Sequence, residues 1–341
     1  MSKDSHVNVV NDVRKASRSN LSAADLVAGY FLYVRRLAAK VALYRKAYRN
    51  YLDVLYASRK RKYPVRVILC KNNCVLELNN LQLSFVASCQ NHDEIEYSLE
   101  DDLVIIPVAS FAEKSDLGHA LPCSKVTLLG GTNNGDIISV FLHREFGSLP
   151  VPGRTVVDIG ANIGDSAVYF AARGAARVIS FEPLYKNYQL AAKNIKVNGL
   201  TDRVIVEQAG CSSFSCNIVI DPEKESNTVS QLSEFSGTGG MQVPLVTLDD
   251  IADRYEIEQG SILKIDCEGC EYDVILSASD STLRKFSHMQ IEYHYGYRNL
   301  EERLRRCGFS VSHTVPKSDP RPQYRNGNKM YVGMIYARQV E

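Results

Sequence analysis

The spacing of apolar residues changes along the 341-residue chain and divides it into three parts. In the first part, apolar residues recur at alternating spacings of four and three, as on one face of a helix. In the second, short β-branched runs are separated by turn residues. From residue 153 onward such runs alternate with longer runs of helical period. We therefore expect an amphipathic helix within residues 1–62, a small β-rich region at 63–146 and an α/β domain at 147–341.

The N-terminal helix is expected to start at Ser22, which has the spacing of a capping box with Asp25, and to end before Pro64. Its apolar stripe consists of Tyr30, Val34, Leu37, Val41, Tyr44, Tyr48, Tyr51 and Leu55. Such a stripe suits a helix on a membrane surface, on nucleic acid or in a dimer. It suits equally a helix that packs on its own domain with a solvated basic face.

The β-rich region contains short alternating or β-branched runs separated by Asn-Asn, Asp-Asp and Gly-Gly pairs. The expected β segments are residues 65–69, 74–78, 81–86, 103–108 and 126–129. Residues 137–146 are expected to form a strand or a helix that leads into the next domain. Cys70 and Cys74 have no second ligand pair nearby, which argues against zinc.

The α/β domain is expected to be a doubly wound, Rossmann-like parallel sheet, because its strands and helices alternate. The expected strands are residues 155–158, 177–181, 203–207, 262–265 and 289–293, with further candidates at 217–220 and 242–246. The expected helices are residues 163–173 and 184–197. Residues 309–313 and 331–337 are expected to form a closing hairpin.

Charge is concentrated in the first part of the chain. Residues 1–62 carry fourteen Lys or Arg against four Asp, a net charge of +10, which leaves −9 for the remainder of a chain whose total is +1. This asymmetry suits an anionic partner, RNA or a membrane surface, or contact with the acidic remainder of the same chain. The polar N-terminus, the lack of an apolar run near ~20 residues and the scattered cysteines together predict a cytoplasmic protein.

The first motif is a Gly-x-x-x-Gly turn, Gly160 to Gly164, which follows an apolar strand ending in Asp158. It lacks the third glycine of the dinucleotide fingerprint, whereas S-adenosylmethionine has no pyrophosphate and has cationic groups that suit an acid. Glu182 ends the next strand, 24 residues after Asp158, where an acid can accept both ribose hydroxyls. The expected cofactor contacts are Asp158, Gly160, Ala161, Asn162, Gly164, Asp165, Ser166, Glu182, Pro183, Gln208 and Ala209.

The second group of candidates follows two later strands. Asp266 and Glu268 lie where a methyl group would be presented, so they could deprotonate an acceptor hydroxyl or hold a cation that does. His294 lies two residues after Glu292, so both could face the same pocket. We take Asp266, Glu268 and His294 as catalytic candidates, Glu271 as a helix-capping acid, and assign no metal site.

Two cysteines lie within this second group. Cys267 and Cys270 have the spacing of a redox motif, but we expect them to be small buried residues rather than a disulfide pair.

Together these motifs resemble the FkbM-type methyltransferase family over about residues 140–295. The resemblance is carried by Val157-Asp158-Ile159-Gly160-Ala161-Asn162-Ile163-Gly164, Phe181-Glu182-Pro183, Thr247-Leu248-Asp249-Asp250, Lys264-Ile265-Asp266-x-Glu268-Gly269-x-Glu271 and Glu292-x-His294. It implies a class I S-adenosylmethionine-dependent methyltransferase, usually acting on the oxygen of a natural product or glycan. It also implies that Glu182 holds the ribose and that Asp266 and Glu268 face the transfer site. Cys267 and Cys270 depart from the family pattern.

Three functions follow from these expectations. The first is O-methylation of a sugar, glycan or lipid-linked acceptor. The second is methylation of RNA held by the basic segment 1–62. The third is a non-catalytic scaffold of the same fold, with the N-terminal helix driving formation of a homodimer.

Overall fold

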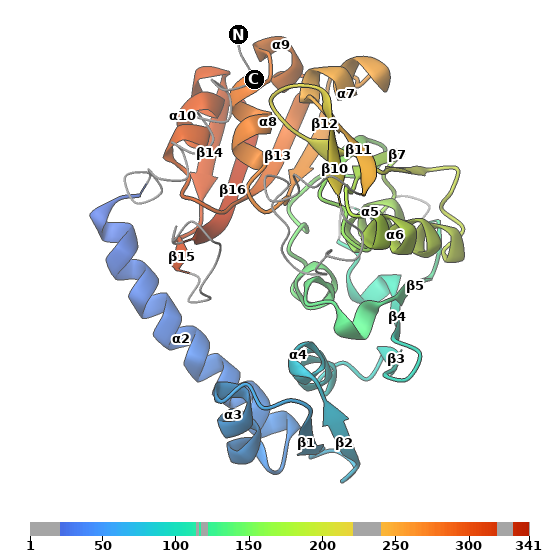
Figure 1. Cartoon of the computed structure of the whole chain (residues 1–341), viewed down its shortest axis with the longest axis vertical. Helices are drawn as coiled ribbons and strands as arrows, with labels where there is room; N and C mark the ends of the chain where they lie inside the picture. Colours follow the sequence, from blue (N-terminus) through green and yellow to red (C-terminus); the bar gives the residue numbers. More distant parts are fainter. Residues whose placement is uncertain (1–20, 114–115, 117–121, 221–239, 319–329, 341) are drawn as a thin grey trace.

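The computed structural model describes residues 21–113, 116, 122–220, 240–318 and 330–340 (Figure 1). The strands of its largest sheet are β6 (Thr155–Ile159), β7 (Arg177–Phe181), β8 (Val204–Glu207), β12 (Ser261–Ile265), β13 (Phe286–Tyr293), β14 (Phe309–His313), β15 (Lys317–Ser318) and β16 (Tyr331–Gln339). Their order is β14-β16-β13-β12-β6-β7-β8, and β15 also pairs with β16. The strands from β13 to β8 run parallel, whereas β16 is antiparallel to both neighbours.

Helices cover both faces of this sheet. They are α5 (Asp165–Ala172), α6 (Tyr185–Val197), α7 (Leu248–Arg254), α8 (Glu271–Ser277), α9 (Asp280–Leu283) and α10 (Arg298–Arg306). Side chains alternate along each strand, so Val156 and Ile262 enter one apolar core with α5, while Val157 and Leu263 enter another with α7, α8 and α10. The doubly wound α/β sheet is therefore confirmed, and every strand expected in this domain is present.

A small three-stranded sheet lies beside the large one. It consists of β9 (Gly210–Cys211), β10 (Cys216–Ile220) and β11 (Met241–Val246). β11 is central, antiparallel to β10 and parallel to β9. The expected strands at 217–220 and 242–246 are thus present, but they form a sheet of their own.

The expected N-terminal helix is divided in two. The two helices are α2 (Ala23–Ala47) and α3 (Tyr51–Arg59). α2 begins with the expected capping box, in which the Ser22 side chain accepts from the Asp25 N–H. The division lies at Tyr48, whose extended backbone pairs with Leu69. The expectation of one continuous helix is wrong because this pairing interrupts the helical backbone.

Only the second half of the apolar stripe is buried. Tyr44 and Tyr48 are 1% and 0% exposed, whereas Tyr30 and Leu37 are 67% and 51% exposed. The buried half packs against the helix Asn80–Cys89 of the next region, where the Tyr48 hydroxyl donates to the Leu83 carbonyl at 2.6 Å. No helix among the described residues is both long enough and apolar enough to cross a membrane.

The region between α3 and the large sheet mixes strands and helical turns. Its strands are β1 (Val65–Ile68), β2 (Val75–Leu78), β3 (Glu96–Ser98), β4 (Leu103–Pro107) and β5 (Lys125–Leu129). Its helical segments are α4 (Asn80–Cys89), η1 (Val108–Ser110), η2 (Gly131–Asn133) and the π-helical turn η3 (Ile138–Leu142). The strand expected at 81–86 is wrong, because Asn79 and Gln82 form a capping box that starts α4. Of the two forms expected for 137–146, the helical one is observed.

This region shares its apolar core with the large sheet. Leu83 and Val104 belong to the same buried cluster as Val156 of β6 and Val168 of α5. A buried ion pair adds to the contact, with the Arg173 guanidinium 2.5 Å from the Asp116 carboxylate. The two parts of the chain are therefore packed against each other.

Candidate active site

A cavity of about 540 Å³ lies at the carboxyl ends of the parallel strands. Ligands of open α/β sheets bind at such ends, and cavities of this size hold small molecules. Ten of the expected site residues line it: Gly160, Asn162, Asp165, Ser166, Glu182, Pro183, Ala209, Asp266, Glu268 and His294. The other four, Asp158, Ala161, Gly164 and Gln208, are outside its lining. The structure thus brings both groups of candidates into one cavity.

The glycine turn is required by close packing. Gly160 has φ +85°, and a Cβ there would lie 1.7 Å from the backbone oxygen of Asp266. Gly164 has φ +81°, and a Cβ would lie 3.0 Å from the Cα of Ala191 on α6. The end of β6 can therefore lie against the end of β12, which places the turn beside the acidic residues.

Glu182 joins the ends of β6 and β7. Its two carboxylate oxygens accept from the N–H of Asn162 at 2.8 Å and of Leu184 at 3.0 Å. Burial raises the pKa of Glu182 to about 7, although the Leu184 and Asn162 N–H groups act in the opposite direction. The amide of Asn162 donates to Asp136 at 2.9 Å, and its Oδ1 is buried without a hydrogen-bond partner. An acceptor atom of this kind at the cavity wall fits a ligand that brings hydroxyl or ammonium donors.

Asp158 is held by side chains from α5, β7 and β12. Its Oδ2 accepts from Ser166 at 2.8 Å and from Ser180 at 3.2 Å, while Oδ1 lies 3.0 Å from the Lys264 Nζ. Lys264 also donates to the Gly160 carbonyl at 2.7 Å. Burial opposes the charge of Lys264, but the Asp158 and Asp266 carboxylates outweigh it and raise its pKa. Asp158 therefore holds the turn in place through Lys264.

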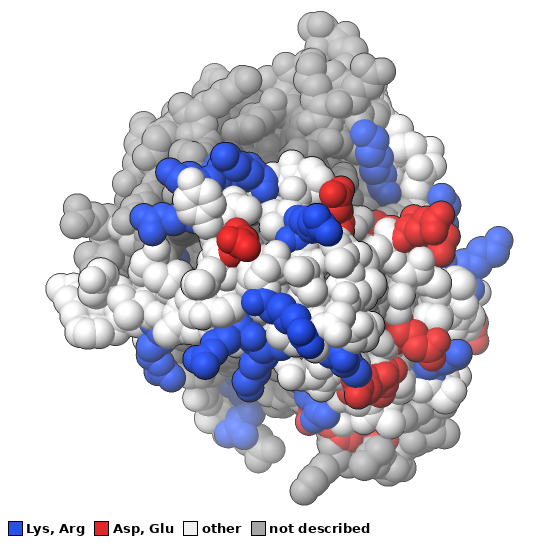
Figure 2. Space-filling model, turned by 90° about the horizontal axis from the view of Figure 1, so that it is seen from below, with Lys and Arg blue, Asp and Glu red and all other residues white. Residues whose placement is uncertain are grey.

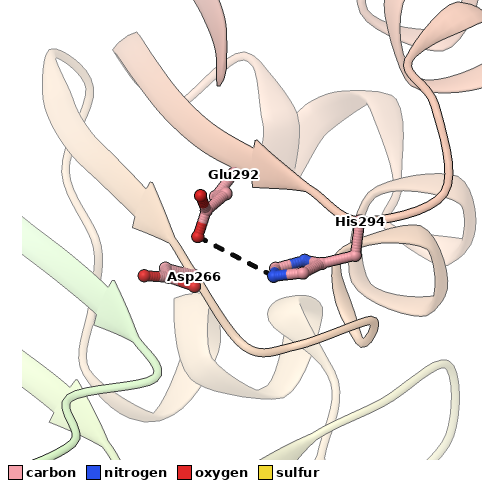
Figure 3. A group of neighbouring side chains, drawn as sticks. All are labelled: Asp266, Glu292 and His294. Carbon is pink, nitrogen blue, oxygen red and sulfur yellow. Dashed lines mark ion pairs between the residues drawn. The ribbon is translucent and has the colours of Figure 1, made fainter. Parts of the chain in front are cut away.

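The same cavity contains Asp266, Glu292 and His294, which converge from β12 and β13 (Figure 3). The Nε2 of His294 lies 3.3 Å from Glu268 and 3.7 Å from Glu292. On the other side of the ring, Nδ1 lies 3.0 Å from the Glu271 carboxylate. Burial lowers the pKa of His294, but Glu271, Glu268 and Glu292 outweigh it, so the pKa lies well above the usual value.

Further carboxyl groups line the same cavity, and together with Asp266, Glu268 and Glu292 they form an acidic wall. Burial and then Asp136 raise the pKa of Asp165 well above its usual value. Burial, together with Asp266 and Asp136, raises the pKa of Glu145 to about 7. Burial and Asp266 raise the pKa of Glu292. Several carboxyl groups of this cavity therefore retain protons at a pH where exposed carboxyl groups are ionised.

The expectation for the two cysteines near Asp266 is wrong. Cys267 and Cys270 form a disulfide, and both are only partly buried at the cavity wall. The chain turns between β12 and α8, which brings their Cα atoms to 5.5 Å. A separation of this size permits a disulfide, which the sequence spacing alone left open.

Several residues of the site were not predicted from the sequence. Lys264 has a recognisable signal, because a charged residue inside the apolar run of β12 requires a buried partner. Glu271 lies in the first turn of α8 as expected, but its carboxylate accepts from the Gly269 N–H and from His294. Asp136 and Glu145 lie ahead of the first motif in a stretch without a local signal, and only the fold brings them to the cavity.

The sheet order and the cavity at its carboxyl ends define a Rossmann-like class I methyltransferase fold. Residues 158–311 match the Methyltransferase FkbM domain. The family resemblance expected from the motifs is confirmed.

Individual relatives are more distant. The AMB antimetabolite synthetase AmbE of Pseudomonas aeruginosa is 30% identical over 205 residues, 47% of this chain and 10% of that protein. Methyltransferase sdnD of Sordaria araneosa is 25% identical over 151 residues, 35% of this chain and 58% of that protein. The chain thus spans a tenth and somewhat over half of these two relatives. The crystal structure of methyltransferase FkbM from Methylobacillus flagellatus is 14% identical, with a TM-score of 0.36, and covers 76% of this chain and 55% of that one.

Proposed function

We propose that the protein transfers a methyl group from S-adenosylmethionine to a hydroxyl oxygen of a sugar, glycan or lipid-linked acceptor. One observation carries the proposal: a single cavity joins the Gly160 turn and Glu182 to the carboxylates around His294. When bound, S-adenosylmethionine supplies an electrophilic methyl group on a sulfonium. The acidic wall suits this cation, and alignment of the two reactants accounts for a large share of the rate.

The residues near β6 and β7 fit the cofactor. The Glu182 carboxylate uses one lone pair on each oxygen for backbone N–H groups, which leaves acceptor capacity for the two ribose hydroxyls. The Oδ1 of Asn162 offers a further acceptor. Asp158 is a positioning residue in this proposal, because it lies outside the cavity lining and acts through Lys264.

The residues after β12 and β13 fit the acceptor. A hydroxyl must lose its proton as its oxygen takes up the methyl group, and Asp266, Glu268 and Glu292 are carboxylates at this wall. Each of these three carboxylates could accept that proton as a general base. Arg36 and Lys317 line the same cavity and suit an acceptor that carries negative charge.

Calorimetry with S-adenosylhomocysteine tests the cofactor half of the proposal. We expect binding by the full chain and a loss of at least about tenfold in affinity for Glu182→Ala. Glu207→Gln is the matched control, because Glu207 ends the neighbouring β8 outside the cavity lining. No binding by the unmodified chain, or equal binding by Glu182→Ala, contradicts the proposal.

Methyl-labelled cofactor tests the acceptor half. Cell extract incubated with the protein is separated into glycan, lipid and RNA fractions, and label is expected in the glycan or lipid fraction. The cytoplasmic location is part of the same proposal, and cell fractionation tests it. Label in none of these fractions supports the scaffold function instead.

RNA is the second candidate acceptor, because the basic residues of α2 and α3 are exposed. Figure 2 shows Lys and Arg side chains spread over the lower face of the molecule, with Asp and Glu mostly toward one side. The exposed cations are Arg35, Arg36, Arg45, Lys46, Arg49, Arg59, Lys60, Arg61 and Lys62. Changing Arg45, Lys46 and Arg49 to Glu should abolish RNA binding that weakens steeply with salt. Binding that is insensitive to salt or to these changes excludes this candidate.

The exposed apolar residues of α2 support two other partners, a membrane surface and a second copy of the chain. Tyr30, Phe31, Val34 and Leu37 are each about half exposed or more. Vesicle flotation with anionic lipid tests the first partner, and light scattering of the full chain tests the second. Replacing Tyr30 and Phe31 by Ser should remove whichever interaction is observed.

A further inference from the structure

We propose that Asp266, Glu292 and His294 form a binding site for a divalent metal ion. Each residue offers one ligand atom, and these atoms all lie within 4.8 Å of one another. Figure 3 shows Glu292 and the His294 imidazole facing each other at the end of β13, with Asp266 beside them at the end of β12. A metal ion about 2.1 Å from each ligand keeps its ligands about 3 to 4 Å apart, and the 3.7 Å between His294 Nε2 and Glu292 is within that range.

The orientation of His294 is an independent observation in favour of a metal. A histidine that binds a metal through one ring nitrogen usually donates the other ring N–H to a carboxylate. Here Glu271 accepts from both the backbone N–H of His294, at 2.9 Å, and its Nδ1, at 3.0 Å. Both side chains are almost completely buried, at 2% and 0% exposure. The ring is therefore fixed with Nε2 turned toward the carboxylates, and the Nδ1 proton identifies Nε2 as the ligand atom.

Glu271 is itself held in place. The carboxylate oxygen that does not contact His294 accepts from the Gly269 N–H at 2.8 Å. Gly269 belongs to the turn between β12 and α8 that also carries Asp266 and Glu268. The same turn therefore provides one ligand and fixes the carboxylate that orients another.

The neighbouring Lys264 is attracted by Asp266, but its closest partners lie elsewhere. Lys264 Nζ lies 3.0 Å from Asp158 and donates to the Gly160 carbonyl, at the cofactor end of the cavity. A cation between Asp266 and Glu292 would separate two carboxylates that otherwise face each other. Two carboxylate oxygens and one imidazole nitrogen suit a first-row divalent ion such as Mn²⁺, with open positions toward the cavity.

The consequence for catalysis rests on the proposed function. A bound metal would supply Lewis acidity, which lowers the pKa of a hydroxyl at one of its open positions. Glu268 would accept the proton of that hydroxyl as its oxygen forms the bond to the methyl carbon and the carbon–sulfur bond of the sulfonium breaks, with S-adenosylhomocysteine as the leaving group. The metal would thus select acceptors whose reacting oxygen can coordinate it.

Titration of the chelator-treated full chain with Mn²⁺ alone, followed by electron paramagnetic resonance of the free ion, tests the site. We expect one bound ion per chain, and a loss of at least about tenfold in affinity for Glu292→Gln and for Asp266→Asn. Glu271→Gln should weaken binding by about 10- to 100-fold without removing a ligand. Glu207→Gln is the control that should leave the Mn²⁺ affinity unchanged, and thermal unfolding confirms that each variant is folded.

The titration tests the metal site independently of the proposed function, because no cofactor takes part in it. If the unmodified chain binds neither Mn²⁺ nor Zn²⁺, or if Glu292→Gln and Asp266→Asn bind Mn²⁺ as tightly as it does, the metal site is overturned. Binding of S-adenosylhomocysteine by the same chelator-treated chain would leave the methyltransferase function standing. Conversely, Mn²⁺ binding without S-adenosylhomocysteine binding keeps the site and removes that function.

Discussion

Glu182 lies where the end of β7 meets the turn after β6, and its pKa lies near neutral pH. Burial raises its pKa to about 7, while backbone N–H groups, Lys264 and Asn187 favour the charged form. A protonated Glu182 would lose acceptor capacity that the proposed contact with ribose requires. We therefore expect the pH dependence of cofactor binding to follow the protonation of Glu182.

We predict that the affinity for S-adenosylhomocysteine falls as pH decreases below about 7. Below the pKa the carboxyl group must release its proton before it can bind, which costs about tenfold in affinity per pH unit. Calorimetry between about pH 5.5 and 8.5 measures this slope. In Glu182→Gln the affinity should be lower and the slope smaller. An identical slope in both proteins would assign it to other carboxyl groups of the cavity.

The pair of Asp158 and Lys264 gives a second prediction at this scale. Both side chains are buried, at 0% and 3% exposure, so either one alone would be an unpaired charge inside the sheet. We expect Asp158→Asn or Lys264→Met to lower the free energy of unfolding by about 3 to 5 kcal/mol, measured in urea. The double variant should lose less than the sum of the two. Additive losses would show that the pair is not coupled.

Local sequence predicted those residues of the site that lie in short motifs. The glycine turn, Glu182, Asp266 and His294 each follow a strand whose pattern is clear. The partner of Lys264 depends on the strand register, which places Lys264 beside Asp158. Register between strands about a hundred residues apart in the chain is a tertiary property, so no local pattern contains it.

At the scale of elements, α2 shows how far periodicity predicts contact. Its stripe has one period, yet the part near Tyr44 and Tyr48 is buried while Tyr30 and Leu37 are exposed. The other end is attached through polar contact, where the Tyr297 hydroxyl donates to Asp25 at 2.8 Å. In Figure 1, α2 runs along the outside of the molecule between these two attachments. Periodicity predicted the helix, but the surface it meets depends on the fold.

We predict different costs for two tyrosines of the same stripe. Tyr44→Ala removes a ring that is 1% exposed and should lower the free energy of unfolding by about 3 to 5 kcal/mol. Tyr30→Ala removes a ring that is 67% exposed and should change it by less than about 0.5 kcal/mol. Urea unfolding measures both. A large cost for Tyr30→Ala would mean that another molecule covers this face in solution.

At the scale of the whole molecule, the N-terminal region and the large sheet share one apolar core. Val54, Leu83 and Val104 lie in the same cluster as Val156 and Val178. The boundary placed at residue 147 follows a change in sequence pattern and remains a prediction about the chain's organisation. The shared core indicates that the two parts stabilise each other.

We predict that residues 147–341 do not fold as a separate fragment. Without the preceding region, one face of the sheet would expose apolar side chains, and Arg173 would lose its buried partner Asp116. Circular dichroism of the purified fragment should show no cooperative thermal transition, whereas the full chain should show one. A soluble fragment with its own cooperative transition would establish two independent domains.

The disulfide beside Asp266 has a consequence for side reactions. A thiolate is the strongest nucleophile that a protein side chain offers, and Cys267 and Cys270 lie at the wall of a cavity proposed to hold an activated methyl group. While they are joined, neither sulfur carries a thiolate. In the proposed function the bond would prevent methylation of these cysteines, and its reduction would place a competitor for the methyl group inside the site. Because the cytosol keeps thiols reduced, the cellular compartment would decide whether this protection operates.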